Sequence, residues 1–219
     1  MMISINLHRA IICVCLFVLL AVGAPAVLGQ NSGQTDRAAA LKNDDVNLDL
    51  ELYLIVASNE RAGGTEIPAV LDRVNKQLHS TLPFKNYSLV ATLIGRVKNE
   101  GHLELTWLGG SLLAPHAALE YTPTFSQFTI GQVKYVDSDG GPMVRMLHFN
   151  YGARFPIQTG TNIPASGTNS APILQYERTG LSTDISVRPD EPGIVGSLNV
   201  GPSGDALVIV VSAKRAVNR

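Results

Sequence analysis

The sequence predicts an α+β fold dominated by strands, with a strand–helix–strand start followed by short, mostly antiparallel strands. Three observations predict it. Apolar residues alternate with polar ones over residues 46–57, the apolar spacing becomes helical over 66–82, and later runs alternate again between turn residues. The 219 residues are 45% hydrophobic and only 16% charged, with 20 glycines, which favours one β-rich domain. We place this domain at residues 46–215.

The first strand carries the clearest pattern in the chain. Successive strand side chains point to opposite faces, so one face here is wholly aliphatic: Val46, Leu48, Leu50, Leu52, Leu54 and Val56. The other face begins polar, with Asn47 and Asp49, and turns apolar near Ile55. The second half of the strand is therefore expected to be covered on both faces.

A helix is predicted for Glu66–Leu82. Its apolar residues follow helical spacing: Ile67, Val70, Leu71, Val74 and Leu78. Thr65 is the expected N-cap, Pro68 falls in the first turn, where a missing N–H is tolerated, and Pro83 ends the helix.

The rest of the chain reads as strands. One run places Tyr87, Leu89, Ala91, Leu93 and Val97 on a common face. Residues 137–141 predict a hairpin turn, and the run ALVIVVSA at 206–213 predicts a buried central strand. Residues 159–172 are rich in Gly, Ser, Thr, Asn and Pro and predict a long polar loop.

Residues 1–29 have the layout of a secretory signal peptide, and residues 30–45 that of a flexible polar spacer. Cleavage after Gly29 or after Ala26, and retention as a membrane anchor, remain open. Both cysteines, Cys13 and Cys15, fall in the leader, so we expect an exported chain whose mature part has no thiol.

Common catalytic and metal-binding patterns are missing from the sequence. It has no H-E-x-x-H, Walker A or G-x-S-x-G motif, and His79, His102, His116 and His148 are scattered. We therefore predict no catalytic, cofactor-binding or metal-binding residues. The net charge of −1 without a Lys/Arg cluster argues against nucleic-acid binding.

One segment resembles a known family. Residues 153–160 (ARFPIQTG) precede the polar loop, and residues 174–189 (LQYERTGLSTDISVRP) follow it. This order resembles the core of bacterial secretins, the outer-membrane channels of type II and III secretion and type IV pilus systems. The resemblance covers 153–189 most closely and assigns structural roles to seven residues: Pro156, Thr159, Gly160, Tyr176, Gly180, Leu181 and Pro189. Gly180 is expected to form a tight turn with positive φ, and Pro189 to end the following strand.

The resemblance implies a non-catalytic protein of the bacterial periplasm or outer membrane that works by assembly. Its expected partners are further copies of itself or other secretion-system subunits, with possible outer-membrane association. Two alternatives stay open. One is a monomeric periplasmic or secreted binding module without pore formation, and the other is a secreted enzyme built on His116 or His148 with distant carboxylates.

Overall fold

The computed structural model describes residues 46–60, 64–109, 122–138, 140–162, 171–200 and 204–216. All described residues belong to one compact unit, Lys42–Arg219. The predicted signal peptide and spacer, residues 1–29 and 30–45, lie outside the described residues. Their boundaries, and that of the single domain at 46–215, stay predictions.

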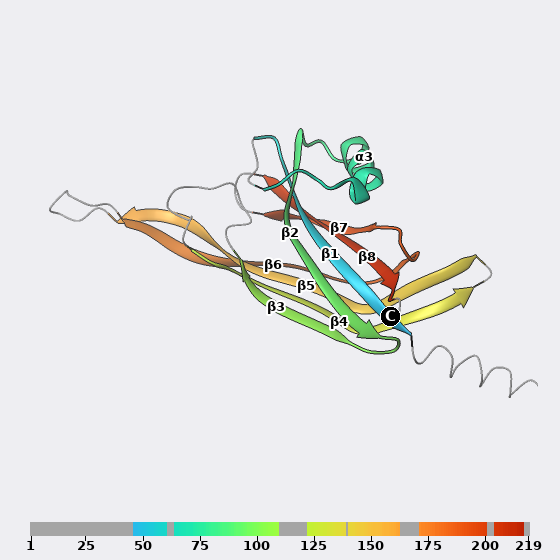
Figure 1. Cartoon of the computed structure of the whole chain (residues 1–219). Coiled ribbons are helices and arrows are strands. Elements are labelled where there is room, and N and C mark those ends of the chain that lie inside the picture. Colours follow the sequence, from blue (N-terminus) through green and yellow to red (C-terminus); the bar gives the residue numbers. More distant parts are fainter. Residues whose placement is uncertain are drawn as a thin grey trace, which may run out of the picture. The chain divides into compact units, whose positions relative to one another are not determined.

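The described chain forms two four-stranded sheets in which every strand pairing is antiparallel. Sheet 1 has the order β2-β1-β8-β7 and sheet 2 the order β3-β4-β5-β6 (Figure 1). The elements are β1 Asn47–Ser58, η1 Ala69–Leu71, α3 Asp72–Thr81, β2 Asn86–Lys98, β3 Leu103–Gly109, β4 Thr124–Ser138, β5 Gly141–Asn162, β6 Ala171–Val187, β7 Gly193–Val200 and β8 Asp205–Arg215. The predicted β-dominated fold of antiparallel strands is confirmed for the described residues.

Strands β1 and β8 lie at the centre of sheet 1, as their apolar sequences predict. One face of β1 packs in the main core between the two sheets, through residues such as Leu50 and Leu54. The other face joins a second core beneath the helix, with Tyr53, Ile55 and Ala57. The expectation that the second half of β1 is covered on both faces is confirmed.

The helix begins later than the sequence predicts. Thr65 is not its N-cap, because the Thr65 backbone N–H and C=O both bond to Leu89 of β2 at 2.9 Å. Pro68 is extended, with φ −67° and ψ 152°, and the chain enters η1 only at Ala69 and α3 at Asp72. Leu71, Val74 and Leu78 face the second core, whereas Val70 is half exposed.

A β-bulge changes which face the residues of β2 occupy. Leu54 of β1 pairs with Ala91 and Ile55 with Leu89, so Val90 is the extra residue. Leu89 therefore packs in the second core and Ala91 in the main core. The prediction that Tyr87 through Val97 share one face is wrong, because the bulge reverses the alternation at Val90.

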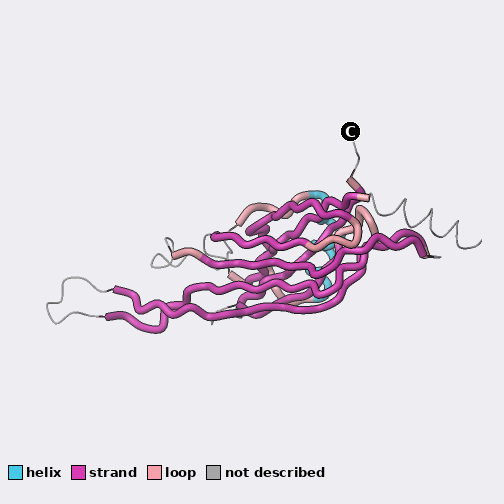
Figure 2. The backbone as a smooth tube through the Cα atoms, turned by 90° about the horizontal axis from the view of Figure 1, so that it is seen from below, coloured by secondary structure: helices cyan, strands magenta, loops and turns pink. Residues whose placement is uncertain are grey.

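The strands of sheet 2 are longer than predicted. β5 has 22 residues and β6 has 17, and together they form a hairpin that runs out beyond the neighbouring strands (Figures 1 and 2). The predicted loop at 159–172 is therefore shorter, since strand pairing extends to Asn162 and resumes at Ala171. Residues 163–170 lie outside the described part. The predicted turn near residues 137–141 is confirmed, with Ser138 opposite Gly141.

A second bulge keeps both halves of β5 facing the main core. Two residues, Leu147 and His148, stand opposite Asp184 of β6, between the pairs Met146–Ile185 and Phe149–Thr183. The His148 backbone, with φ 54°, donates its N–H to Asp184 Oδ1 at 2.6 Å. Even-numbered residues up to Met146 and odd-numbered ones from Phe149 consequently point into the same core.

Candidate functional site

The β5–β6 hairpin carries six of the seven residues that the sequence singled out. Pro156 pairs with Tyr176, Gly160 with Ile173, and Leu181 with Tyr151. Thr159 is the extra residue of a bulge, and its hydroxyl donates to the Ile173 carbonyl at 3.3 Å. Pro189 lies apart, in the turn after β6 ends at Val187, where the Asp190 N–H bonds to the Ala213 carbonyl of β8.

Gly180 is not in a turn, so that prediction is wrong. It lies inside β6 opposite Gly152, and positive φ occurs among the described glycines only at Gly64, Gly141 and Gly204. Glycine is needed here because the backbones of β5 and β6 lie close together: a Cβ at Gly180 would lie 2.9 Å from the Tyr151 carbonyl oxygen. The glycine therefore lets the two strands approach each other.

The two glycines form the floor of a groove on the outer face of sheet 2. The register aligns one cross-strand row from β3 to β6: Thr106, Gln127, Gly152 and Gly180. The groove has a volume of about 660 Å³ and includes this row in its lining. A Cβ at Gly152 would meet nothing within 4 Å, so the missing side chain leaves open space at that point.

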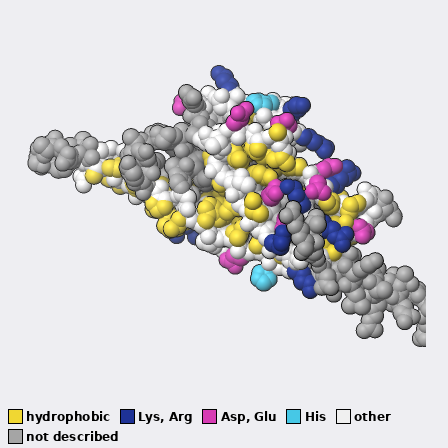
Figure 3. All heavy atoms as spheres, viewed as in Figure 1, with side chains coloured by type: hydrophobic (Ala, Val, Ile, Leu, Met, Phe, Trp, Pro, Cys, Tyr) yellow, Lys and Arg dark blue, Asp and Glu magenta, His cyan; other side chains and the backbone are white. Residues whose placement is uncertain are grey.

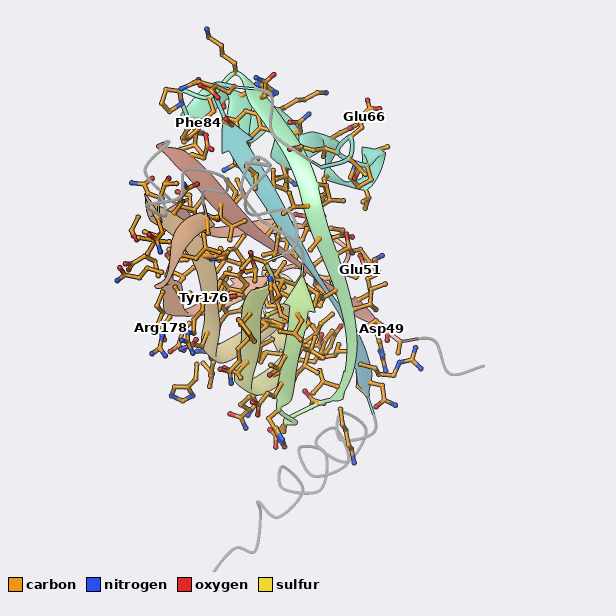
Figure 4. The ribbon with its side chains drawn as sticks, turned by 90° about the vertical axis from the view of Figure 1, so that its left-hand side faces the viewer. Asp49, Glu51, Glu66, Phe84, Tyr176 and Arg178 are labelled. Atoms are coloured by element: carbon orange, nitrogen blue, oxygen red, sulfur yellow. The ribbon has the colours of Figure 1, made fainter. Side chains whose placement is uncertain are left out.

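One wall of the groove combines aromatic and cationic side chains. It belongs to the next cross-strand row, Leu108, Phe125, Arg154 and Arg178, in which Phe125 and the two arginines line the groove and Leu108 lies just outside it. Tyr176 stands beside that row, with its ring 5.6 Å from the Phe125 ring and 5.9 Å from the Arg154 guanidinium carbon. The Tyr176 hydroxyl donates to the Pro123 carbonyl at 3.0 Å, which fixes the ring. Figure 4 labels Tyr176 and Arg178, which lie near each other on the same side of the molecule.

The opposite wall is polar and contains Asn150 and Ser182. The acidic residue at the β3 end of this row, Glu104, is not part of the lining and accepts a hydrogen bond from Gln127 at 3.0 Å. In the described part of the chain, neither Arg154 nor Arg178 has a carboxylate within ion-pair distance. No carboxylate of the described residues therefore compensates the positive charge of the groove.

Sheet 1 carries a different polar group, on the part of its outer face beyond the helix. Arg96 donates to both oxygens of Asp49, at 2.6 and 3.0 Å, and Lys214 donates to Glu51 at 2.9 Å. The Tyr53 hydroxyl also donates to Glu51. Figure 3 shows charged side chains gathered where β1 begins and β8 ends, and Figure 4 shows Asp49 and Glu51 along β1.

These contacts shift the acid–base equilibria of the group. The hydrogen bond from Arg96 lowers the pKa of Asp49. Burial raises the pKa of Glu51, but hydrogen bonds from Tyr53 and Lys214 outweigh it and leave a net lowering. Burial and the neighbouring Glu51 together raise the pKa of Tyr53. Both carboxylates are thus held in their charged forms, as expected of a structural ion-pair group.

Tyr151 is buried on the core face of sheet 2, and its hydroxyl has no hydrogen-bond partner among the described residues. Burial raises its pKa to about 12, and the neighbouring Ser126 hydroxyl offsets part of that shift without reaching hydrogen-bond geometry. The Ser126 and Thr124 hydroxyls are also buried and have no hydrogen-bond partner in the described part of the chain. These are exceptions to the rule that buried polar groups are paired.

Sequence reasoning missed the residues that shape the groove, above all Gly152, Arg154 and Arg178. The resemblance included both arginines but gave neither a role. Their alternation with core residues was a usable signal, since it places them on the outer face.

Among the described residues, no group of three or more His, Cys, Asp or Glu side chains is arranged to hold a metal ion. No helix in the described ranges is long and apolar enough to cross a membrane.

Comparisons with known proteins find similarity among solved structures only; no family model and no curated protein matches. The chain is similar to the secretin domain of InvG from the Salmonella SPI-1 injectisome, with 12% identity, a TM-score of 0.39 and coverage of 87% of this chain and 68% of that solved chain. It is also similar to a Klebsiella pneumoniae type II secretion outer-membrane complex of PulD, PulS and the PulC HR domain. There the identity is 11%, the TM-score 0.41, and coverage 87% of this chain and 44% of the other.

Proposed function

We propose that this chain is an exported, non-catalytic subunit of the bacterial cell envelope that works by assembling with copies of itself, as a secretin core does. The observation that carries the proposal is the β5–β6 hairpin. It carries most of the segment 153–189 that resembles secretins, and its outer strand β6 is an edge of sheet 2 with 17 residues.

The free edges suggest how copies would join. An edge strand presents unpaired backbone N–H and C=O groups that can pair with a strand of another chain. Sheet 2 has β6 at one edge and β3 at the other. Pairing β6 of one copy with β3 of the next is a head-to-tail contact, and such contacts close into rings when the rotation between copies permits.

Cysteine cross-linking tests this assembly. In a Cys13→Ser/Cys15→Ser background, Ser182→Cys on β6 is combined with Glu104→Cys, Thr106→Cys or Leu108→Cys on β3. The three β3 positions cover different registers of the same outer face, within reach of a disulfide once the strands pair. We expect at least one pair to give a ladder of covalent oligomers in a non-reducing gel.

The control pair combines Ser182→Cys with Gln77→Cys, an exposed residue of α3. It should give no ladder. Light scattering of the exported protein, with and without detergent, supplies the mass independently. A monomer under both conditions, with no ladder from any pair, would exclude assembly and favour the alternative of a monomeric binding module, which the groove on sheet 2 would then serve.

A further inference from the structure

We propose that the groove on the outer face of sheet 2 is a docking site for an acidic, extended peptide segment of a partner protein. It is lined by Phe125, Gln127, Gly152, Arg154 and Arg178. The proposal goes beyond assembly, because it concerns the outer face of the sheet and not its edges.

Charge is the first argument. Arg154 and Arg178 stand directly opposite each other on β5 and β6, an arrangement that places like charges side by side and costs stability. Within the described ranges neither has an acidic partner. Glu177, between Tyr176 and Arg178, points to the other face by strand alternation. Two guanidinium groups so placed can bind carboxylates through paired hydrogen bonds.

Shape is the second argument. The floor row crosses four strands, which at about 4.8 Å per strand spacing gives a length of roughly 14 Å. An extended peptide of about four residues has that length at roughly 3.3 Å per residue. The glycine pair lowers the floor at one end of the row, and open space lies above Gly152.

Side-chain chemistry is the third argument. Gln127 and Asn150 carry amide groups that can both donate to and accept from a peptide backbone. Phe125 and Leu108 are 44% and 66% exposed and offer an apolar surface next to the arginines. A ligand with a carboxylate and a nearby apolar side chain could contact both the arginines and the apolar side chains of this wall.

The same features argue against a lipid surface. A bilayer is broad and meets flat or convex surfaces, whereas these cations line a concave groove. Each basic residue near an anionic membrane contributes only about 1 kcal/mol, so two of them give weak attachment. A peptide can enter the groove and use the cations, the amides and the apolar wall together.

Fluorescence anisotropy with the full exported chain tests the proposal. The probe is a fluorescein-labelled, acetylated peptide of sequence Glu-Gly-Phe-Gly-Glu, whose Glu and Phe side chains project to one side of an extended chain, and its counterpart has Gln in place of each Glu. We expect the acidic probe to bind, and the Arg154→Gln/Arg178→Gln variant to bind it at least about tenfold more weakly. Higher salt should also weaken the binding.

Two further variants make the test specific. Arg145→Gln removes an exposed arginine further along β5, outside the groove, and should leave the affinity within about twofold. Gly152→Val puts a side chain on the floor where a Cβ would meet nothing within 4 Å, and it should weaken binding about as much as the arginine double variant. Circular dichroism would reveal whether the double variant fails to fold. In that case the Gly152→Val variant still tests whether the peptide binds in the groove.

Three results would overturn the proposal. One is equal binding of the acidic probe and its Gln counterpart, and another is an Arg145→Gln effect as large as that of the double variant. The third is no binding of the acidic probe at about 1 mM; arginine-dependent binding to vesicles of phosphatidylglycerol and phosphatidylcholine would then assign the face to a membrane. The oligomer mass is measured separately, so failure here is distinct from failure of the assembly proposal.

Discussion

The two sheets differ in how their faces are covered. Sheet 1 is covered on both faces over much of its length, by the main core on one side and by α3 on the other. Sheet 2 packs one face in the main core and leaves the other open, with the groove at Gly152 and Gly180. Sheet 1 therefore contributes both of its faces to apolar cores, whereas sheet 2 contributes one face and has the other available for binding; each sheet ends in two edge strands.

The first prediction tests this division with two leucines. Leu54→Ala removes a fully buried side chain of β1 in the main core and should lower the free energy of unfolding by about 2–5 kcal/mol. Leu108→Ala removes a side chain of β3 that is 66% exposed and should change it by less than about 0.5 kcal/mol. Urea unfolding followed by circular dichroism measures both, and similar losses would mean that the sheets do not differ.

The second prediction compares the two glycines of sheet 2. A Cβ at Gly180 would meet the Tyr151 carbonyl oxygen at 2.9 Å, so Gly180→Val should cost about 1–3 kcal/mol by forcing the strands apart. Gly152→Ala faces open space and should be neutral or stabilising by up to about 1 kcal/mol. Thermal unfolding distinguishes them, and a Gly180→Val protein of unchanged stability would contradict the close approach.

The sequence predicted sheet 1 better than sheet 2 for a physical reason. Burial on both faces leaves long apolar runs, as in β8, and burial on one face leaves strict alternation, as at the start of β1. Both patterns are visible without knowing which strands pair. The N-cap at Thr65 failed because a long-range backbone pairing with Leu89 took the groups that a helix start would have used.

The groove could not be predicted because it depends on register. Gly152, Arg154 and Arg178 are outer-face residues by alternation, but their neighbours across the strands follow from two bulges and from the length of the loop between β5 and β6. A shift of one residue would have placed Arg154 beside Glu177 or Thr179. Gly180 was assigned to a turn because glycine has two uses, positive φ and close approach, which sequence alone does not distinguish.

The third prediction compares one tyrosine in each sheet. Tyr53→Phe removes a hydrogen bond to Glu51 and should cost about 1 kcal/mol. Tyr151→Phe removes a buried hydroxyl that has no partner among the described residues, so it should be neutral or stabilising by up to about 1 kcal/mol.

Titration supplies a check on Tyr151. Because its folded pKa is raised to about 12, its contribution to stability is present below the unfolded pKa of about 10 and is lost as the pH rises from 10 towards 12. The Tyr151→Phe protein should lack this component of alkaline destabilisation. A clear loss of stability in Tyr151→Phe at neutral pH would instead reveal a partner for the hydroxyl.

The smallest effect concerns the ion pairs of sheet 1. The folded pKa values of Asp49 and Glu51 are lowered, so their contribution is present above the unfolded pKa of about 4 and is lost as the pH falls through the folded values. The Asp49 and Arg96 side chains are partly exposed, so water and salt screen their attraction.

We expect the urea midpoint to fall by roughly 0.1–0.3 M more in the wild type than in Asp49→Asn between pH 6 and pH 3. Gln77→Ala, at an exposed position of α3 that carries no titratable group, is the control and should follow the wild type. If Asp49→Asn also follows the wild type, the pair with Arg96 adds nothing to sheet 1, whose stability would then rest on its two apolar faces alone.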